Sequence, residues 1–333
     1  MSSTLEVLES VSRLSDYVVR ILGQNPGKFT LQGTNTYLIG KRRPFTLIDT
    51  GEGKPEYIPL LESHLRRASA DTDANLAHVS DIIISHWHPD HVGGLPSVLT
   101  LLRDLWGEGN KTLPFKPPRI HKFPHSSLPD DRLQQVMDSI SPDTYTPSPT
   151  GSLFHDLVNG KSFAVDASSE TSLHVIHSPG HTEDSISLLL PFDNALYTAD
   201  TVLGQGTAVF EDLSTYISTL RSLLRESGKY SVLYPGHGPV VHDGAKLIST
   251  YIEHRMERET QIVQVLQQPP PEGENAWSTW EIVSKIYAGY PRNLWEPAAR
   301  SVAQHLKKLQ RESKVVKTSG EGTDARWKLL ARM

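Results

Sequence analysis

The sequence predicts an α/β protein with one large domain and a small C-terminal module. Between residues 18 and 267, short runs of Val, Ile, Leu and Tyr bounded by Gly and Pro alternate with segments of helical periodicity. Pro269-Pro270-Pro271-Glu272-Gly273 then interrupts the pattern, because consecutive prolines remove backbone donors and break a helix. We therefore predict a large domain over 1–268 and a module over 269–333.

The expected strands of the large domain are short and apolar, and they lie at 18–21, 36–39, 45–48, 79–85, 162–167, 173–177, 185–190, 195–197 and 231–234. The expected helices lie at 57–67, 95–105, 213–225 and 244–267. Residues 107–160 are rich in Pro, Gly and Ser, so we expect loops there with one helix near 131–139.

The C-terminal module begins with a helix start signal, the capping box Ser278-Thr279-Trp280-Glu281. A second helix is expected over 296–312, followed by a hairpin of 314–317 with 326–330. Two helices followed by a hairpin resemble a winged-helix module. We expect the tryptophans of this end to form its core rather than a platform on which bases stack: Trp277, Trp280, Trp295 and Trp327.

The composition suits a globular chain and restricts its chemistry. A hydrophobic content of 37% and a charged content of 21% disfavour extended disorder. The absence of cysteine excludes disulfides, thiolate zinc sites and cysteine nucleophiles, so metal ligands must be His, Asp or Glu. Residues 1–9 have neither the basic nor the apolar region of a signal peptide, and no apolar run is long enough to span a bilayer. We expect a cytoplasmic protein with no membrane partner.

The hexapeptide His86-Trp87-His88-Pro89-Asp90-His91 follows a predicted strand and carries the chemistry. Side chains two residues apart share a face only in extended structure, so His86 and His88 can hold one ion if this stretch is extended. Pro89 favours that conformation in the residue before it and also suits the first position of a helix, which places Asp90 and His91 in the first turn. One strand-to-helix elbow can thus supply ligands to two metal ions.

Three later strands each lead to a further candidate ligand, namely His181, Asp200 and His237. Imidazoles and carboxylates that leave positions open for water are typical of a catalytic zinc site rather than a structural one. We interpret His174 as a surface residue and His177 as, at most, a residue that supports the ligands.

The elbow together with these three residues resembles the complete ligand set of the metallo-β-lactamase superfamily. The resemblance implies a four-layer αββα metallo-β-lactamase sandwich with a small C-terminal winged-helix-like module. It also implies two zinc ions: one held by His86, His88 and His181, the other by Asp90, His91 and His237, with Asp200 bridging them. Asp49, in Asp49-Thr50-Gly51, matches an early Asp of the superfamily that supports the site.

Such a centre indicates hydrolysis, because two zinc ions lower the pKa of a bound water from about 15.7 towards about 7. We expect Asp90 to be the catalytic proton acceptor at an acyl or phosphoryl centre, with Asp200 able to share that role. A non-enzymatic scaffold that keeps an inactive metal site would lack at least one of these ligands, and none is missing here. Oxygen and nitrogen ligands alone leave zinc, manganese and iron open.

Three stretches, 25–37, 202–212 and 234–239, are similar to two families within the superfamily. One comprises lactamase-like thioesterases of fungal polyketide biosynthesis, which release the product from the acyl carrier protein of a synthase that lacks its own releasing domain. The other is the β-lactamase-like protein 2 family of endoribonucleases, which cleave single-stranded RNA and end in a winged-helix-like module. The chain has no room between His181 and His237 for the inserted domain of the β-CASP nucleases.

The charge is unevenly distributed along the chain. Residues 300–333 hold nine Lys or Arg against three acids, a net +6, so the remainder carries −11 of the total of −5. A basic end fits either an acyl carrier protein or RNA, since both are polyanions, and a solvated helix face explains it equally well. The acidic remainder favours the carrier protein, because an RNA-binding surface is more broadly basic. We therefore predict a thioesterase of secondary metabolism, with an endoribonuclease as the alternative.

Overall fold

The computed structural model describes residues 5–68, 73, 75–126, 131–165 and 171–330. It divides into two compact units, one of residues 1–211 with 222–247 and the other of residues 212–221 with 248–333. The domain boundary between 268 and 269 stays a prediction. Among the described residues, no helix is long and apolar enough to cross a membrane.

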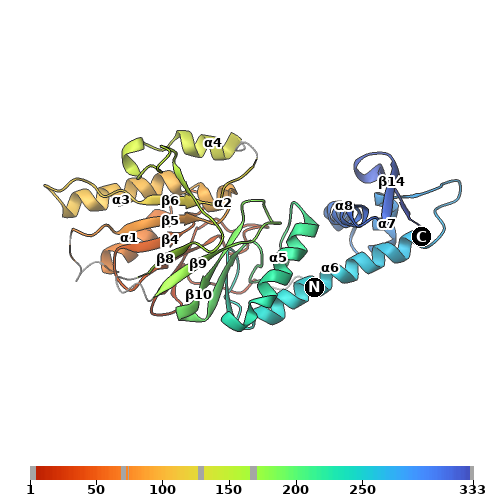
Figure 1. Ribbon diagram of the computed structural model, residues 1–333, viewed down its shortest axis with the longest axis horizontal. Helices are drawn as coiled ribbons and strands as arrows, with labels where there is room; N and C mark the ends of the chain where they lie inside the picture. The colour runs from red at the N-terminus through yellow and green to blue at the C-terminus, as the bar shows by residue number, and fades with distance from the viewer. Residues whose placement is uncertain (1–4, 69–72, 74, 127–130, 166–170, 331–333) are drawn as a thin grey trace. The chain divides into compact units, whose positions relative to one another are not determined.

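The first unit contains two β-sheets (Figure 1). The larger has the strand order β1-β2-β3-β4-β5-β6-β7, antiparallel up to β4 and parallel from β4 onwards. Its strands are β1 (Val11–Arg13), β2 (Val18–Leu22), β3 (Asn35–Ile39), β4 (Phe45–Ile48), β5 (Val79–Ile84), β6 (Arg119–Lys122) and β7 (Phe154–Asp156).

The second sheet has the order β12-β11-β10-β9-β8, in which only β11 and β12 are parallel. Its strands are β8 (Ser162–Ala164), β9 (Ser172–His177), β10 (Ile186–Leu190), β11 (Ala195–Ala199) and β12 (Val232–Pro235). The helices up to residue 266 are α1 (Tyr57–Ala68), α2 (Pro89–Val92), α3 (Leu95–Gly109), α4 (Asp131–Asp138), α5 (Leu213–Arg225) and α6 (Gly244–Leu266). Short 3₁₀ turns lie at 142–144, 191–193 and 227–229.

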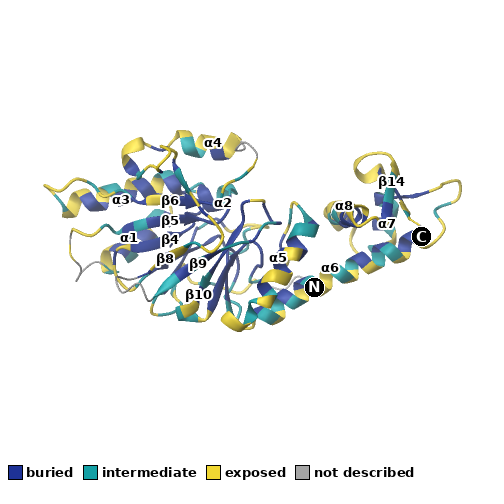
Figure 2. Cartoon of the chain, viewed as in Figure 1, coloured by how far each residue is buried: buried dark blue, intermediate teal, exposed yellow. Residues whose placement is uncertain are grey.

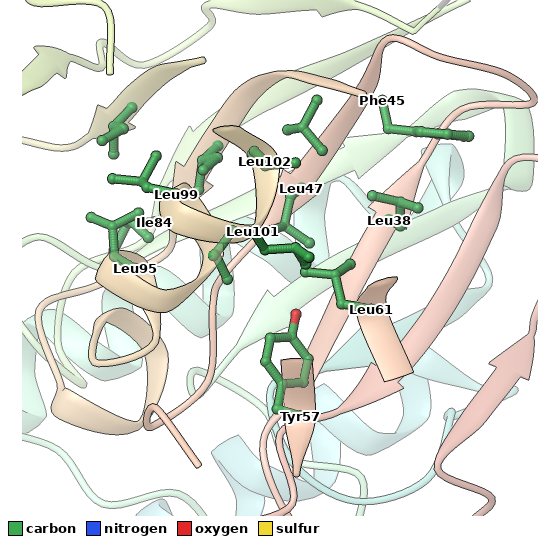
Figure 3. Close-up of a cluster of buried hydrophobic side chains, with 14 of the residues drawn as sticks. Leu38, Phe45, Leu47, Tyr57, Leu61, Ile84, Leu95, Leu99, Leu101 and Leu102 are labelled. Atoms are coloured by element: carbon green, nitrogen blue, oxygen red, sulfur yellow. The ribbon is translucent and has the colours of Figure 1, made fainter. Parts of the chain in front are cut away.

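Successive side chains of a strand point to opposite faces of the sheet. Both faces of the larger sheet are covered by apolar clusters. On β4, Leu47 packs into the outer core with helices α1 and α3, which Figure 3 shows around Leu61 and Leu99. Ile48, the next residue, packs into the inner core against side chains of the second sheet such as Leu188. Both faces of β4 are therefore apolar, and Figure 2 shows these central strands as buried.

Most predicted elements are confirmed, with ends shifted by no more than four residues, but β1 was missed, as were β6 and β7 inside 107–160. Strand β6 has the sequence Arg-Ile-His-Lys, in which only Ile120 is apolar. Its polar side chains are satisfied by carboxylates instead: Arg119 and His121 contact Asp81, and Lys122 lies 2.5 Å from Asp184. A strand stabilised by ion pairs gives no hydrophobic run. Of the predicted strand 162–167, residues 166 and 167 lie outside the described residues.

The second unit has a core built by the end of α6, by α7 (Thr279–Ile286) and α8 (Trp295–Arg311), and by a three-stranded sheet in the order β13-β15-β14. The strands are β13 (Trp277–Ser278), β14 (Val315–Ser319) and β15 (Arg326–Leu329), with 3₁₀ turns at 292–294 and 322–324. The predicted hairpin is thus confirmed as β14 and β15. The capping box is also confirmed, because Ser278 Oγ accepts a hydrogen bond from the Glu281 N–H at 3.1 Å while Glu281 accepts one from the Ser278 N–H.

The tryptophans of this unit form its core, as expected. Trp277, Trp295 and Trp327 are buried, and Trp280 packs against them. Each buried indole N–H has a partner: Trp277 donates to the Gln268 carbonyl and Trp327 to Thr279 Oγ1. Rings held in this way are not free to stack on bases.

A buried ion pair joins α6 to α8 in the second unit. Glu259 Oε2 lies 2.6 Å from Lys308 Nζ and 3.8 Å from His305 Nδ1. Burial raises the pKa of Glu259, but the neighbouring His305 and Lys308 outweigh it and lower the pKa to about 2. The carboxylate therefore stays ionised in the folded protein at pH values where most Glu residues are protonated.

We expect Glu259→Gln to weaken the fold in a pH-dependent way. Because the folded-state pKa lies below the ordinary value, ionised Glu259 stabilises the protein above about pH 4.5, and this contribution is lost as the pH falls towards about 2. The free energy of unfolding in urea should drop by about 1–3 kcal/mol near neutral pH, and the deficit should shrink on acidification. Glu257→Gln, an exposed change on the same helix, is the control. A deficit that stays constant down to about pH 3 would contradict this assignment.

Candidate metal centre

The predicted strand-to-helix elbow is confirmed. His88 follows β5 closely and adopts an extended conformation, with φ −60° and ψ 142°, while Pro89 is the first residue of α2. Proline disfavours helical geometry in its predecessor and fits the first helical position, where no hydrogen bond is needed. Asp90 and His91 therefore lie in the first turn of α2, on the same side of the sheet as His86.

Three imidazole nitrogens converge at one point of the elbow. His86 Nε2 lies 3.0 Å from His88 Nδ1 and 3.3 Å from His181 Nε2, and the remaining separation, His181 Nε2 to His88 Nδ1, is 3.0 Å. Tetrahedral coordination with metal–nitrogen distances of about 2.0–2.1 Å places ligand nitrogens about 3.3 Å apart. This triangle therefore has nearly the dimensions that a tetrahedral ion requires.

A second convergence lies beside the first. Asp90 Oδ2 is 3.1 Å from His237 Nε2 and 3.4 Å from His91 Nε2, and the two histidine nitrogens are 3.4 Å apart. Asp200 contacts both groups, because its Oδ2 is 3.2 Å from His237 Nε2 and 3.7 Å from His181 Nε2. All seven predicted ligands are thus brought together in a cluster suited to binding metal.

The parallel pairing of β11 and β12 places Asp200 beside His237. Both residues follow the carboxyl end of a strand, and Gly236 lies between β12 and the histidine. A Cβ at Gly236 would lie 2.4 Å from Asp200 Oδ1 and 3.1 Å from His91 Cε1, so only glycine allows this approach. Ala199 adopts a left-handed φ of 45° immediately before Asp200, which is backbone strain of the kind concentrated at functional sites.

The ring nitrogens that face away from the cluster are also held. His181 Nδ1 donates to the Val209 carbonyl at 2.8 Å, and His86 Nδ1 lies 2.9 Å from Ser85 Oγ. Thr34 Oγ1 donates to Asp90 Oδ2 at 3.2 Å. Such outer contacts fix ring orientation and so keep each ligand atom aimed at the ion.

Asp49 is the main supporting residue, as the sequence predicted. Its fully buried carboxylate accepts hydrogen bonds from the Ser85 N–H at 2.7 Å, from Ser85 Oγ at 2.8 Å and from Tyr197 OH at 2.5 Å. The same carboxylate lies 2.8 Å from His91 Nδ1, which directs Nε2 of that ring at the cluster. Ser85 and Tyr197 were not recognised in the sequence, since both occur within ordinary strand patterns.

The electrostatics of the cluster favour cations. Burial lowers the pKa of His86 well below its ordinary value and that of His88 to about 4, so each ring offers a free lone pair at neutral pH. Burial also acts on His237, but there Asp200 and Asp90 outweigh it and raise the pKa to about 9. The buried carboxylates therefore require positive charge beside them, which a metal ion supplies.

Two cavities of the first unit lie near the cluster in the chain. The smaller, which we call the mouth recess, has a volume of about 290 Å³ and is lined by five of the predicted ligands together with residues 28–31, 203 and 205–209. The larger, which we call the Trp87 cavity, has a volume of about 550 Å³ and is lined by Trp87, the residue between His86 and His88 in the sequence. The mouth recess therefore gives access to the cluster.

His174 and His177 lie outside the cluster, as expected. His174 bonds to Ser162 Oγ at 2.7 Å on the surface of the second sheet. His177 stacks on Phe123 with ring centroids 3.8 Å apart and an interplanar angle of 4°. Most residues of the Trp87 cavity come from 107–160, the stretch in which β6 and β7 were missed, so their positions in a cavity were not predicted from the sequence.

Comparison with known proteins agrees with this architecture. Residues 29–237 match the model of the metallo-beta-lactamase superfamily. The chain belongs to the metallo-β-lactamase superfamily. It is a hydrolase of that superfamily with the predicted fold class, and residues 278–327 match the beta-lactamase associated winged helix domain.

Two curated relatives represent the two families suggested by the sequence. A beta-lactamase-like protein 2 homolog of Drosophila melanogaster is 37% identical, covering 93% of this chain and 94% of that protein. An atrochrysone carboxyl ACP thioesterase of Aspergillus novofumigatus is 35% identical, covering 81% of this chain and 69% of that protein. A beta-lactamase domain protein of Burkholderia ambifaria shares the fold, with a TM-score of 0.66 at 16% identity over 96% of this chain and 93% of that one.

We expect Asp49→Asn to weaken metal binding, because the amide no longer offers two acceptor oxygens to Ser85, Tyr197 and His91. Loss of such outer contacts lowers metal affinity about 10–100-fold. Competition with a chelator, followed by measurement of metal bound per chain, gives the affinity. Asp104→Asn, an exposed change on α3, is the control and should bind as the wild type does. Equal affinity of the Asp49 variant and the control would show that Asp49 does not position His91.

Proposed function

We propose that the chain is a dinuclear zinc hydrolase. His86, His88 and His181 would hold one ion and Asp90, His91 and His237 the other, with Asp200 in contact with both groups. The nitrogen separations in the first group and the carboxylates beside the second group support this assignment. Imidazole and carboxylate ligands suit zinc, and the mouth recess gives water access to both groups.

When bound, zinc supplies Lewis acidity, which makes water a stronger acid and a carbonyl carbon more electrophilic. Hydrolysis adds the water hydroxyl to the acyl carbon, and the departing sulfur takes the remaining proton. Asp90 accepts the proton of the attacking water and delivers it to the thiolate. Its side chain is about 21% exposed and lines the mouth recess, while the Thr34 hydroxyl and His237 hold its Oδ2.

We propose a thioester as the substrate, carried by an acyl carrier protein as in polyketide release. The observation that carries this choice is the charge of the Trp87 cavity. Among the described residues that line it, Lys122 is paired with the buried Asp184 at 2.5 Å and His125 lies 3.8 Å from Glu183, while Asp156 and Glu211 add two further carboxylates. A carboxylate-rich cavity repels a phosphodiester chain but accepts an uncharged acyl group. The relatives named as ACP thioesterases point to the same reaction.

The second candidate is an endoribonuclease acting on single-stranded RNA. It is favoured by the relatives named beta-lactamase-like protein 2 homologs, which align over 93–94% of the chain, winged-helix segment included. The ion pairing of the C-terminal unit weighs against it. Lys308, Arg311, Lys314, Lys317 and Arg326 each lie within 4.0 Å of a carboxylate of the same unit, which leaves a weaker basic surface than the sequence suggested.

The two candidates separate in one experiment. Zinc-loaded protein is offered an aromatic acyl thioester on an acyl carrier protein and, in parallel, a single-stranded RNA. We expect thioester turnover, its loss on chelation and its return with added zinc. Asp90→Asn should lower the rate by at least about 100-fold, since it removes the proton acceptor, whereas the exposed change Asp104→Asn should not.

RNA cleavage without thioester turnover would support the endoribonuclease instead. Cleavage of RNA that Asp90→Asn abolishes, with both thioester and carrier left intact, would overturn the thioesterase assignment while keeping the hydrolase. Activity that survives complete removal of metal would overturn the dinuclear mechanism itself.

A further inference from the structure

The Trp87 cavity contains none of the proposed ligands, but residues that contact them line it. Trp87 stands between His86 and His88 in the sequence, and its ring is 4.6 Å from that of His88 between centroids. Glu211 also lines the cavity, and its N–H donates to the His181 carbonyl at 3.2 Å. A group bound beside these two residues would therefore lie next to the backbone that carries His88 and His181.

The walls of the cavity are apolar and include aromatic rings. Leu133 and Met137 of α4 form one side, while Leu153 and Phe154 come from β7 and the residue before it. A volume of about 550 Å³ falls within the range of about 300–1,000 Å³ that accommodates drug-sized ligands. The cavity is therefore much larger than an acetyl group needs.

One wall is a fixed flat surface. Phe123 stacks on His177 at 3.8 Å, and His177 is itself held on two sides: its Nε2 lies 2.9 Å from the Glu183 carbonyl oxygen, and its backbone N–H donates to Asn159 Oδ1 at 2.8 Å. A ring fixed against a second ring loses little freedom when a planar ligand stacks beside it. His177 thus positions Phe123, which is a role for this histidine outside the metal centre.

The charges of the cavity select against anions. Lys122 is buried and neutralised by Asp184, and His125 lies 3.8 Å from Glu183, so each cationic side chain of the described lining faces a carboxylate. Asp156 and Glu211 are further, exposed carboxylates. A fatty or aryl carboxylate, or a nucleotide phosphate, would meet these acids without a free lysine to offset them. An acyl group has no such charge while it is still esterified to sulfur.

We propose that the Trp87 cavity is the acyl pocket and that it takes an uncharged, planar aromatic acyl group stacked on Phe123. The proposal rests on the thioesterase function above and adds the substrate class and the residues that select it. The thiol part of the substrate then occupies the mouth recess, beside Lys28 and the exposed Phe29. The carboxylate released by hydrolysis meets the acids of the cavity, which assists its departure.

The test compares two thioesters of N-acetylcysteamine, 2-naphthoyl and acetyl, which need no carrier protein. We expect the wild type to prefer the naphthoyl ester in kcat/KM. Met137→Trp fills the cavity from α4 and should lower kcat/KM for the naphthoyl ester at least about tenfold, with the acetyl ester changed less than about twofold. Ser152→Trp, which adds the same bulk at an exposed position of the cavity, should act in the same direction and does not depend on repacking α4.

Thr100→Trp is the matched control. It adds an indole to a groove of about 510 Å³ beside α1 and α3, which does not contain cluster residues, and both esters should keep their wild-type rates. Equal loss of both esters in the two cavity variants, or no loss of either, would overturn the proposal.

Failure of the thioesterase function gives a different result. If the wild type hydrolyses neither ester, the cavity is tested by ligand binding instead. Binding of 2-naphthol and of 2-naphthoate is measured by their fluorescence. Binding of the uncharged naphthol alone, lost in Met137→Trp and kept in Thr100→Trp, would support the uncharged aryl pocket. No binding of naphthol, or equal binding of the naphthoate anion, would overturn it.

Discussion

A single buried carboxylate, that of Asp49, joins the parts of the first unit that must meet at the metal centre. It follows β4, accepts hydrogen bonds from Ser85 at the end of β5 and from Tyr197 on β11, and lies against His91 in the elbow. These contacts link the two sheets at the point where the ligands converge. A left-handed φ of 58° at Asp49 brings the carboxylate into this position. The neighbouring ligands depend on that link, because a ring turned away from the cluster cannot bind an ion.

The sequence predicted the cluster almost completely because each ligand belongs to a short, local sequence pattern. His86, His88, Pro89 and Asp90 are adjacent, so alternation in extended structure and the preference of proline were sufficient to place them. The other ligands each follow an apolar strand, which periodicity identifies. Contacts between distant parts of the fold were not predicted. The sequence pattern identifies Tyr197 only as a strand residue, and its hydroxyl reaches Asp49 because the two sheets pack together.

The region that we propose to select the substrate was the least predictable part of the chain. Strand β6 is polar, and its stability comes from Asp81 and Asp184, which lie far away in the sequence. A local sequence pattern cannot predict ion pairs between residues that are far apart in the sequence. The same argument applies to charge: the basic surplus of residues 300–333 suggested an anion-binding surface, whereas the fold pairs much of it with acids from α6, with Asp212 and with acids of the module itself. Net charge counted along a chain therefore overestimates the charge that a partner meets.

The order of the ligands along the chain has a consequence for synthesis. A nascent chain that has emerged as far as Ala199 already holds the residues of the first nitrogen triangle, but neither the bridging Asp200 nor His237. Strand β12, which carries the chain to His237, must then pair in parallel with β11. Under the two-ion assignment proposed above, a chain at that stage would offer three imidazoles and an unfinished second group. The cell's metal supply would then meet a mononuclear site before it meets a dinuclear one.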